Sequence, residues 1–309
     1  MLGKLLPLTG RNLLQAMDSN ENRHELEVLI SLLDDPDRKV YHSVRDKIFQ
    51  YGMKALPILE EAWDHQFNPV VQERLEDLIQ AIQKETLANE TSQWLQSNAP
   101  DLLQGALLLA RFQYPELNFE KCRLEIGRII QDVWLELNEK LTPLEKIKVV
   151  NHVLFDVHGF KANVSQPLVL SDLMINNVLE TRRGNSMSLS LLYLIVGQSL
   201  KLPIMGVNLP EYFALSWMHK MPILTHDYTT DDLVSFYINA PAKGMVFVRH
   251  EIERYLKETK HSQNLIYFSP CSNYTVIKRM ALEMLAAYER TKDESRVRLM
   301  KLYLESFKF

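Results

Sequence analysis

The segment spanning residues 180–217, ETRRGNSMSLSLLYLIVGQSLKLPIMGVNLPEYFALSW, has the residue types and spacing most relevant to chemistry. Polar turn residues lead directly into an apolar helix expected from about Met187 to Leu200. The unpaired N–H groups and the dipole of a helix start favour negative charge, and thiol enzymes place a nucleophilic cysteine there because this field lowers its pKa. This chain has Ser186 at that position. A serine nucleophile needs an adjacent general base, since its own pKa is far above neutrality.

The elements that must position Ser186 follow it closely in the sequence. The helix is expected to break at Leu202-Pro203, and residues 204–209 and 212–217 read as two short strands. Residues 234–239 and 246–248 are further strand candidates, separated by a turn at 241–244, and residues 249–257 read as a helix. The pattern therefore predicts a mostly helical chain with several short strands after the helix that begins near Ser186.

Composition excludes several classes of function. The chain has 309 residues, of which 46% are apolar and 24% charged, which is typical of a globular protein. A net charge of −4 gives no electrostatic reason to expect nucleic acid or membrane as a partner. The scarcity of glycine and the absence of GxGxxG, Walker, HExxH and CxxC patterns predict no cofactor and no metal.

Cysteine usage and hydropathy indicate a compartment. The two cysteines, Cys122 and Cys271, make neither a disulfide framework nor a metal site, which favours a reducing cytoplasm. The first is expected to be a small buried apolar residue and the second an ordinary loop residue. The apolar patch at the N-terminus is too short for a secretory signal, and no stretch reaches the roughly 20 apolar residues of a membrane span.

The two ends of the chain are predicted to be helical. Residues 1–98 contain apolar series at helical spacing, and LLDDPDRKVYHSVRDKIFQYGMKALPILEEAW resembles a HEAT-type repeat with a poorer second copy. A plain helical bundle fits residues 1–98 equally well, because two copies are few for a solenoid. Residues 101–156 continue as helices, including a long amphipathic stretch over 119–141. Residues 271–309 are expected to form two helices hinged at Lys292-Asp293, as in a tetratricopeptide-like hairpin.

Residues 102–258 resemble the transglutaminase-like domain of the bacterial SirB-type proteins. The stretches that carry the resemblance are ALLLARFQYPELN, NHVLFDVHGFKAN, NNVLETRRGNSMSLSLLYLIVGQSLKLPIMGVNLPEYF and FYINAPAKG. The resemblance implies a papain-like α+β core over residues 99–270, in which the nucleophile-bearing helix packs against a small antiparallel sheet. Helical extensions on either side also fit that family.

Active members of the transglutaminase-like superfamily use a Cys–His–Asp triad, and the resemblance implies where its members would stand here. The cysteine position falls at Ser186, the histidine position at Tyr212 and the aspartate position at Asn239. We call these the triad positions. A tyrosine with an ordinary pKa of about 10 keeps its proton at pH 7 and is no general base, and an asparagine brings no charge. A helix N-terminus contributes at most about 2 kcal/mol, which does not replace a base worth roughly 10²–10⁴-fold in rate.

Other residues near the triad positions have alternative interpretations. Capping is the default role for Ser186, with a hydrogen-bonded rather than reactive environment. The sequence leaves open whether His219 or His226 lies within hydrogen-bonding distance of Ser186, and His152 and His158 are further candidates. For each of these histidines, an exposed or otherwise hydrogen-bonded side chain is favoured over a catalytic one. The candidates for lining a cleft at Ser186 are Arg182, Arg183, Asn185, Glu211 and Trp217.

Two of these candidates have a specific expectation attached. Arg182 and Arg183 could bind an anionic ligand, but pairing with Glu180, Asp172 or a helix end is favoured about two to one. Glu211 could act as an acid or base if burial raised its pKa, although an exposed carboxylate is favoured.

The leading functional hypothesis is a non-catalytic transglutaminase-like protein that binds a protein or an extended peptide. One alternative is a residual hydrolase or acyl transferase that uses Ser186 as nucleophile. Another is a structural subunit whose cleft is filled by its own side chains. The group within hydrogen-bonding reach of Ser186 Oγ discriminates among them.

Overall fold

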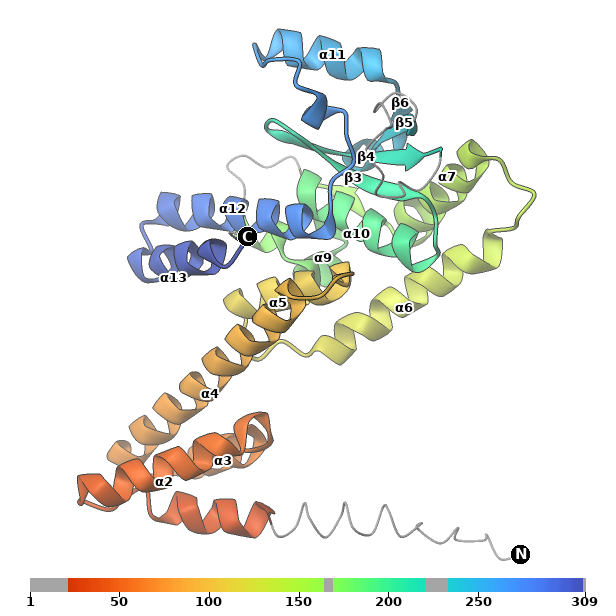
Figure 1. The fold of residues 1–309 in the computed structure, drawn as a ribbon. Coiled ribbons are helices and arrows are strands. Elements are labelled where there is room, and N and C mark those ends of the chain that lie inside the picture. Colours follow the sequence, from red (N-terminus) through yellow and green to blue (C-terminus); the bar gives the residue numbers. More distant parts are fainter. Residues whose placement is uncertain (1–21, 164–168, 220–232, 308–309) are drawn as a thin grey trace, which may run out of the picture. The chain divides into compact units, whose positions relative to one another are not determined.

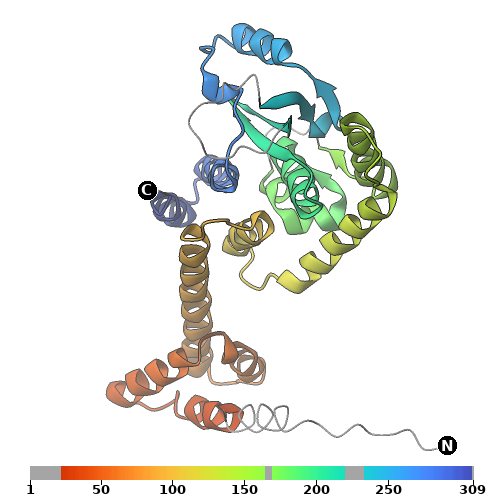
Figure 2. The same ribbon diagram turned by 45° about the vertical axis from the view of Figure 1, so that its right-hand side comes forward.

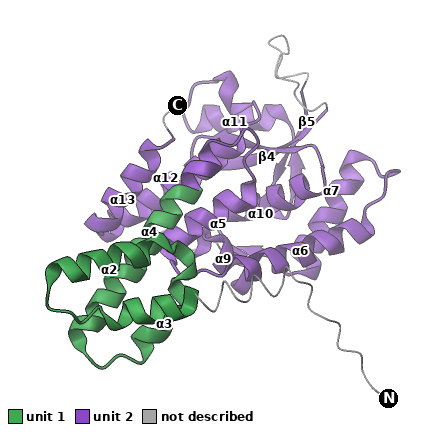
Figure 3. Ribbon diagram, turned by 60° about the horizontal axis from the view of Figure 1, so that its bottom comes forward, with its two compact units in different colours: residues 1–90 green, residues 91–309 purple. Residues whose placement is uncertain are grey.

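The computed structural model describes residues 22–163, 169–219 and 233–307. The chain divides into two compact units, residues 1–90 and residues 91–309 (Figure 3). The expectation for the N-terminal apolar patch and the one for His226 lie outside the described residues.

The first unit is built from helices around one apolar core. Residues 22–31 are helical, followed by α2 (Arg38–Gln50), the short 3₁₀ turn η1 (Gly52–Lys54), α3 (Leu56–Asp64) and the start of α4 (Pro69–Leu95). Asp37 caps α2 by accepting the N–H of Lys39, and Gly52 follows the C-cap residue Tyr51 with a φ of +54°. The core comprises residues at the predicted helical spacing, among them Leu26, Leu33, Val44, Ile48, Leu59, Val71, Leu75 and Ile82.

The second unit begins at Thr91 with the end of α4 and continues as a series of helices. In chain order they are α5 (Leu102–Gln113), α6 (Phe119–Glu136), α7 (Pro143–Asn151), the π-helical turn η2 (His152–Val157), α8 (Leu170–Leu173), α9 (Ile175–Thr181) and α10 (Ser186–Ser199). The expected amphipathic stretch over 119–141 is too long, because α6 ends at Glu136. Asn138 then accepts the N–H of Lys140 in a turn, and a capping box between Thr142 and Glu145 starts α7.

A four-stranded antiparallel sheet follows α10, close to the strand positions that the sequence predicts. Its strands are β3 (Ile204–Leu209), β4 (Tyr212–Met218), β5 (Val234–Asn239) and β6 (Met245–Phe247), in that order. A separate pair of two-residue strands, β1 (Lys161–Ala162) and β2 (Arg183–Gly184), runs parallel just before α10. The mostly helical architecture with a small antiparallel sheet confirms the predicted α+β fold class.

The two faces of this sheet are covered by different helices (Figures 1 and 2). On one face lies α10, where the Gly197 backbone approaches the side chain of Ile204 so closely that an added Cβ would lie 3.0 Å from it. On the other face lies α11 (Arg249–Glu258), whose Ile252 and Leu256 form an apolar cluster with sheet residues. Strand alternation therefore decides which side chains of β3 and β4 face α10 and which face α11.

The C-terminal helices α12 (Asn273–Thr291) and α13 (Glu294–Glu305) form the expected hairpin. Lys292 ends α12 with a φ of +57°, and Asp293 caps α13 by accepting the N–H of Arg296, so the hinge lies where the sequence predicts it. This hairpin belongs to the same compact unit as the sheet. Helix α12 packs against α5, α8 and β3, which places part of α12 beside the start of α10.

Candidate functional site

The start of α10 is fixed by backbone packing and by one side-chain cap. Asn185 is extended and its Oδ1 accepts the N–H of Ser188 at 2.8 Å, so Asn185 and not Ser186 is the N-cap. The expectation that Ser186 caps the helix is wrong, because Ser186 is already its first helical residue. An added Cβ at Gly184 would lie 2.5 Å from Ser188 Oγ, which explains the glycine before the cap. The main chain on either side is tied to α8, where Asp172 O accepts hydrogen bonds from Asn185 N at 3.0 Å and Ser188 Oγ at 2.6 Å.

The hydroxyl of Ser186 is buried and has no hydrogen-bond partner within the described parts of the chain. The expected hydrogen-bonded environment around Ser186 is therefore wrong. Neither a ring nitrogen nor a carboxylate from the described residues lies within hydrogen-bonding reach of Oγ. A serine hydroxyl needs such a group beside it to become a nucleophile.

Tyr212 lies on the face of the sheet opposite to α10. It pairs with Leu209 and packs against the apolar cluster beneath α11, with its ring centroid 6.2 Å from that of Tyr255. Its hydroxyl is also buried without a partner, and this burial raises the pKa of Tyr212 far above its ordinary value. A hydroxyl in this environment does not accept a proton from Ser186.

Asn239 ends β5 and caps the turn that follows. Its Oδ1 accepts the N–H of Ala242 at 3.1 Å in the 3₁₀ turn η4 (Ala240–Ala242). This is the local role that asparagine side chains often take at the end of a strand or the start of a turn. Ser186, Tyr212 and Asn239 thus lie at the helix start and strand ends where they are expected. No hydrogen bond joins these three side chains.

None of the candidate histidines in the described residues is hydrogen-bonded to Ser186 Oγ. His158 Nε2 lies 2.8 Å from a carboxylate oxygen of Asp132, and His152 Nδ1 lies 3.4 Å from Asp156. His219 is exposed just after β4, where its N–H donates to Leu233 O at 2.8 Å. These three histidines do not contact Ser186 Oγ, and their surface or paired roles agree with the favoured interpretation.

The arginine pair at the start of the site separates into two environments. Arg182 adopts a φ of +58°, binds the carboxylate of Glu125 and lies 4.9 Å from the ring centroid of Phe160. Pairing was the favoured role, but Glu125 replaces the expected partners Glu180 and Asp172 because α6 passes beside the end of α9. Arg183 is exposed.

Two other candidates differ in burial. Glu211 is exposed in the tight turn between β3 and β4, with a φ of +57°. Trp217 was expected to line a cleft but is 5% exposed and stacks on Phe236 with ring centroids 5.9 Å apart. Trp217 is therefore a core residue.

Neither cysteine replaces the missing nucleophile. Burial raises the pKa of Cys122 on α6, which confirms its expected character as a small buried residue. Burial also raises the pKa of Cys271 to about 12, and its N–H donates to Gly206 O at 2.7 Å beside β3. Cys271 is therefore more tightly held than the expected loop residue. Among the described residues no group of three or more His, Cys, Asp or Glu side chains could hold a metal.

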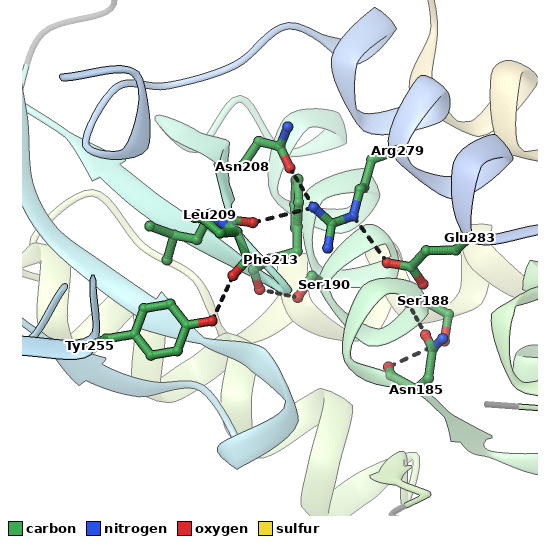
Figure 4. Close-up of polar contacts among 10 residues, drawn as sticks. Asn185, Ser188, Ser190, Asn208, Leu209, Phe213, Tyr255, Arg279 and Glu283 are labelled. Atoms are coloured by element: carbon green, nitrogen blue, oxygen red, sulfur yellow. Dashed lines mark hydrogen bonds and ion pairs between the residues drawn. The ribbon is translucent and has the colours of Figure 1, made fainter. Parts of the chain in front are cut away.

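Two charged residues that the sequence analysis did not single out lie beside the start of α10 (Figure 4). Arg279 and Glu283 on α12 form an ion pair of 3.2 Å, with 20% and 22% of their side chains exposed. Glu283 also accepts a hydrogen bond from the Asn185 side chain, and burial raises the pKa of Glu283. Arg279 Nη1 donates to Asn208 Oδ1 at 3.1 Å and to Leu209 O at 3.3 Å. The only sequence signal was an arginine and a glutamate four residues apart on a helix, which is common on solvated faces.

The fold is that of a mostly helical α+β protein in which α10 packs against a small antiparallel sheet. The family model described as "Transglutaminase-like superfamily" matches residues 120–282, which cover β1 to β6 and the first half of α12. The chain belongs to the transglutaminase-like superfamily.

Several curated proteins are similar to part of this chain. A UPF0162 protein of Vibrio cholerae is 26% identical over 52% of this chain and 54% of its own length. A UPF0162 protein of Xylella fastidiosa is 32% identical over 36% of this chain and 40% of its own length. F-box only protein 21 of Mus musculus is 34% identical over 35% of this chain and 16% of its own length. The chain therefore spans about half or less of each of these relatives, and no solved structure matches it.

Proposed function

We propose that this chain is a non-catalytic member of the transglutaminase-like superfamily that binds a protein or peptide partner. The observation that carries the proposal is the state of Ser186, whose buried hydroxyl has no base within reach among the described residues. Tyr212 points to the α11 face and Asn239 caps a turn, so neither supports acyl transfer at Ser186.

The energetics favour the same conclusion. A general base contributes roughly 10²–10⁴-fold to a rate, whereas the N-terminus of α10 offers at most about 2 kcal/mol to a developing negative charge. The helix field is therefore smaller than the contribution of the base that Ser186 lacks among the described residues.

The proposed partner is a protein or peptide rather than nucleic acid or membrane. The net charge of −4 supports this choice. None of the described helices is long and apolar enough to cross a membrane. The SirB-type assignment, HEAT-like character for residues 1–98, a tetratricopeptide-like character for residues 271–309 and a cytoplasmic location are parts of the same proposal.

A structural subunit with a filled site is the second candidate. The burial of Ser186 Oγ and the presence of Glu283 beside Asn185 favour it, because the chain itself supplies the groups around the helix start. In this version the partner binds to the exterior, for example at the helical first unit, where Phe67 is 96% exposed.

One experiment separates these possibilities from residual catalysis. The full chain and Ser186→Ala are treated with a fluorophosphonate probe, which labels activated serines. We expect no labelling of either protein. Labelling that is lost in Ser186→Ala would overturn the non-catalytic proposal and favour the hydrolase or acyl transferase alternative.

A second experiment locates the binding surface. Partners captured by the full chain are identified by crosslinking and mass spectrometry, then compared with a double variant, Arg183→Glu with Glu211→Lys, and with Phe67→Ser. Both sets of changes are on exposed side chains and should leave folding unchanged. Loss of the partner in the double variant places binding near the triad positions, and loss in Phe67→Ser places it on the first unit. Failure of the full chain to crosslink reproducibly to any protein would contradict an interaction role.

A further inference from the structure

The ion pair on α12 leaves part of its guanidinium unused. An arginine has five N–H donors, and in Arg279 the donors on Nε and Nη1 go to Glu283, Asn208 and Leu209. Nη2 has no partner within residues 22–163, 169–219 and 233–307, and it is not among the buried atoms without partners (Figure 4). With 20% of the side chain exposed, this nitrogen can take a second acceptor from outside.

The carboxylate of Glu283 is bound by donors of two kinds. Arg279 supplies a charged donor, and the Asn185 amide supplies a neutral one. Asn185 is only 8% exposed, and its Oδ1 is held by the N–H of Ser188, so its amide nitrogen is left to face Glu283. A guanidinium and a fixed amide beside a helix N-terminus are the groups that recognise a carboxylate.

We propose that Arg279 and Asn185 form a carboxylate-binding site that the chain's own Glu283 occupies, and that a carboxylate of the partner binds there in exchange. The inference rests on the proposed function, since it names the chemistry by which a protein or peptide partner is recognised. The carboxylate belongs to a peptide C-terminus or to an acidic side chain.

An internal carboxylate lowers the apparent affinity for an external one. The external ligand binds only the fraction of molecules in which Glu283 has left the site, and the apparent dissociation constant rises by the inverse of that fraction. Because Glu283 is tethered on the same helix as Arg279, its effective concentration is in the millimolar range or above. Removing the Glu283 side chain should therefore strengthen binding of a small carboxylate about tenfold or more.

The test uses acetate as the probe on the full chain, with chloride at the same ionic strength as reference. Binding is followed by calorimetry and by the shift of the thermal midpoint. We expect Glu283→Ala to bind acetate about tenfold or more tightly than the wild type, and the double variant Arg279→Met with Glu283→Ala to lose that binding. Glu283→Gln, which keeps the shape of the side chain, serves if Glu283→Ala does not fold, and it should also bind acetate more tightly than the wild type.

A matched control lies on α11. Arg249 and Glu253 have the same spacing at 3.1 Å and are 32% and 34% exposed. Glu253→Ala should leave acetate binding at the wild-type level. Equal acetate binding in the wild type and both Glu283 variants, or an equal gain in Glu253→Ala, would overturn the inference.

Two short peptides distinguish the sources of the carboxylate. One is an acetylated trialanine with a free C-terminus, and the other is acetyl-Ala-Glu-Ala-amide; each is compared with its uncharged counterpart on Glu283→Ala. Preference for either charged peptide supports the site and identifies the source, and preference for neither contradicts it. If Glu283→Ala does not gain acetate binding but the full chain still crosslinks to a partner, only the carboxylate-binding site is wrong. If Glu283→Ala binds acetate but the full chain captures no partner, the proposed interaction role is wrong.

Discussion

Replacing Asn185 with alanine removes two interactions at once. Its Oδ1 caps α10 through the N–H of Ser188 at 2.8 Å, and its amide donates to the mostly buried carboxylate of Glu283. Loss of an N-cap costs about 0.5–2 kcal/mol, and loss of a hydrogen bond to a charged group costs about 1.5–3 kcal/mol. We expect Asn185→Ala to lower the opening free energy of α10 by about 2–4 kcal/mol.

Native-state hydrogen exchange measures this change where it occurs, which is preferable because the chain has two compact units. The buried amides of Leu192 and Tyr193 report on α10, and a loss of about 2–4 kcal/mol should speed their exchange roughly 30- to 700-fold. Asn118→Ala is the matched control: Asn118 caps α6 by accepting the N–H of Lys121 at 3.0 Å in an exposed position. It should cost about 1 kcal/mol in α6.

The comparison between the two caps is decisive. If Asn185→Ala destabilises α10 no more than Asn118→Ala destabilises α6, the contact with Glu283 contributes nothing and the reasoning fails. Asn185→Asp adds a separate check, because it keeps the cap but puts a second negative charge beside Glu283. Its defect should diminish as the pH is lowered and the carboxylates are protonated.

Three further outcomes follow from groups without partners and from one raised pKa. Ser186→Ala should leave the free energy of unfolding unchanged or raise it by up to about 1 kcal/mol, because the Ser186 hydroxyl has no partner among the described residues. Ser188→Ala removes a hydroxyl that donates at 2.6 Å, so it should cost about 1 kcal/mol in urea unfolding. Tyr212→Phe should likewise be neutral or stabilising, because the buried Tyr212 hydroxyl has no partner among the described residues. Tyr193→Phe removes a hydroxyl that donates at 2.8 Å and should cost about 1 kcal/mol. A larger loss of stability in Tyr212→Phe than in Tyr193→Phe would contradict this difference between the two hydroxyls. Burial raises the pKa of Glu283 above the ordinary 4.5, so folding favours the protonated carboxyl. The stability that Glu283 contributes is therefore full below about pH 4.5 and is lost as the pH rises through the folded pKa. Unfolding measured over a pH series should show that loss in the wild type and not in Glu283→Gln.

Local sequence patterns predict the elements around Ser186 because those elements are set by short-range physics. Short strand-like runs with flanking turns give β3, β4 and β5, and an apolar stretch after a polar turn gives α10 within one residue at each end. Gly52 after α2 and Lys292 after α12 both have a positive φ, as is common where a helix ends. Lys292 lies at the hinge that the sequence predicts.

The directions and partners of individual side chains were not predictable in the same way. Tyr212 faces α11 because it pairs with Leu209, and a register of strands is not readable from one strand alone. Both faces of β4 are buried, so strand alternation does not show whether Trp217 belongs to the core or to a cleft. Arg182 binds Glu125 across 57 residues, and Arg279 reaches Asn208 across 71, which are distances in sequence that no local pattern bridges.

The Gly-Asn pair before Ser186 shows why a motif of this kind indicates the fold more firmly than the activity. Gly184 is required because a Cβ would meet Ser188 Oγ at 2.5 Å, and Asn185 is required to cap α10; both demands are mechanical and persist whether or not a nucleophile follows. The nucleophile position itself makes no contact that the helix start depends on, since Ser186 Oγ has no partner in the described residues. A chain can therefore keep the helix start of a transglutaminase-like site while its catalytic groups change.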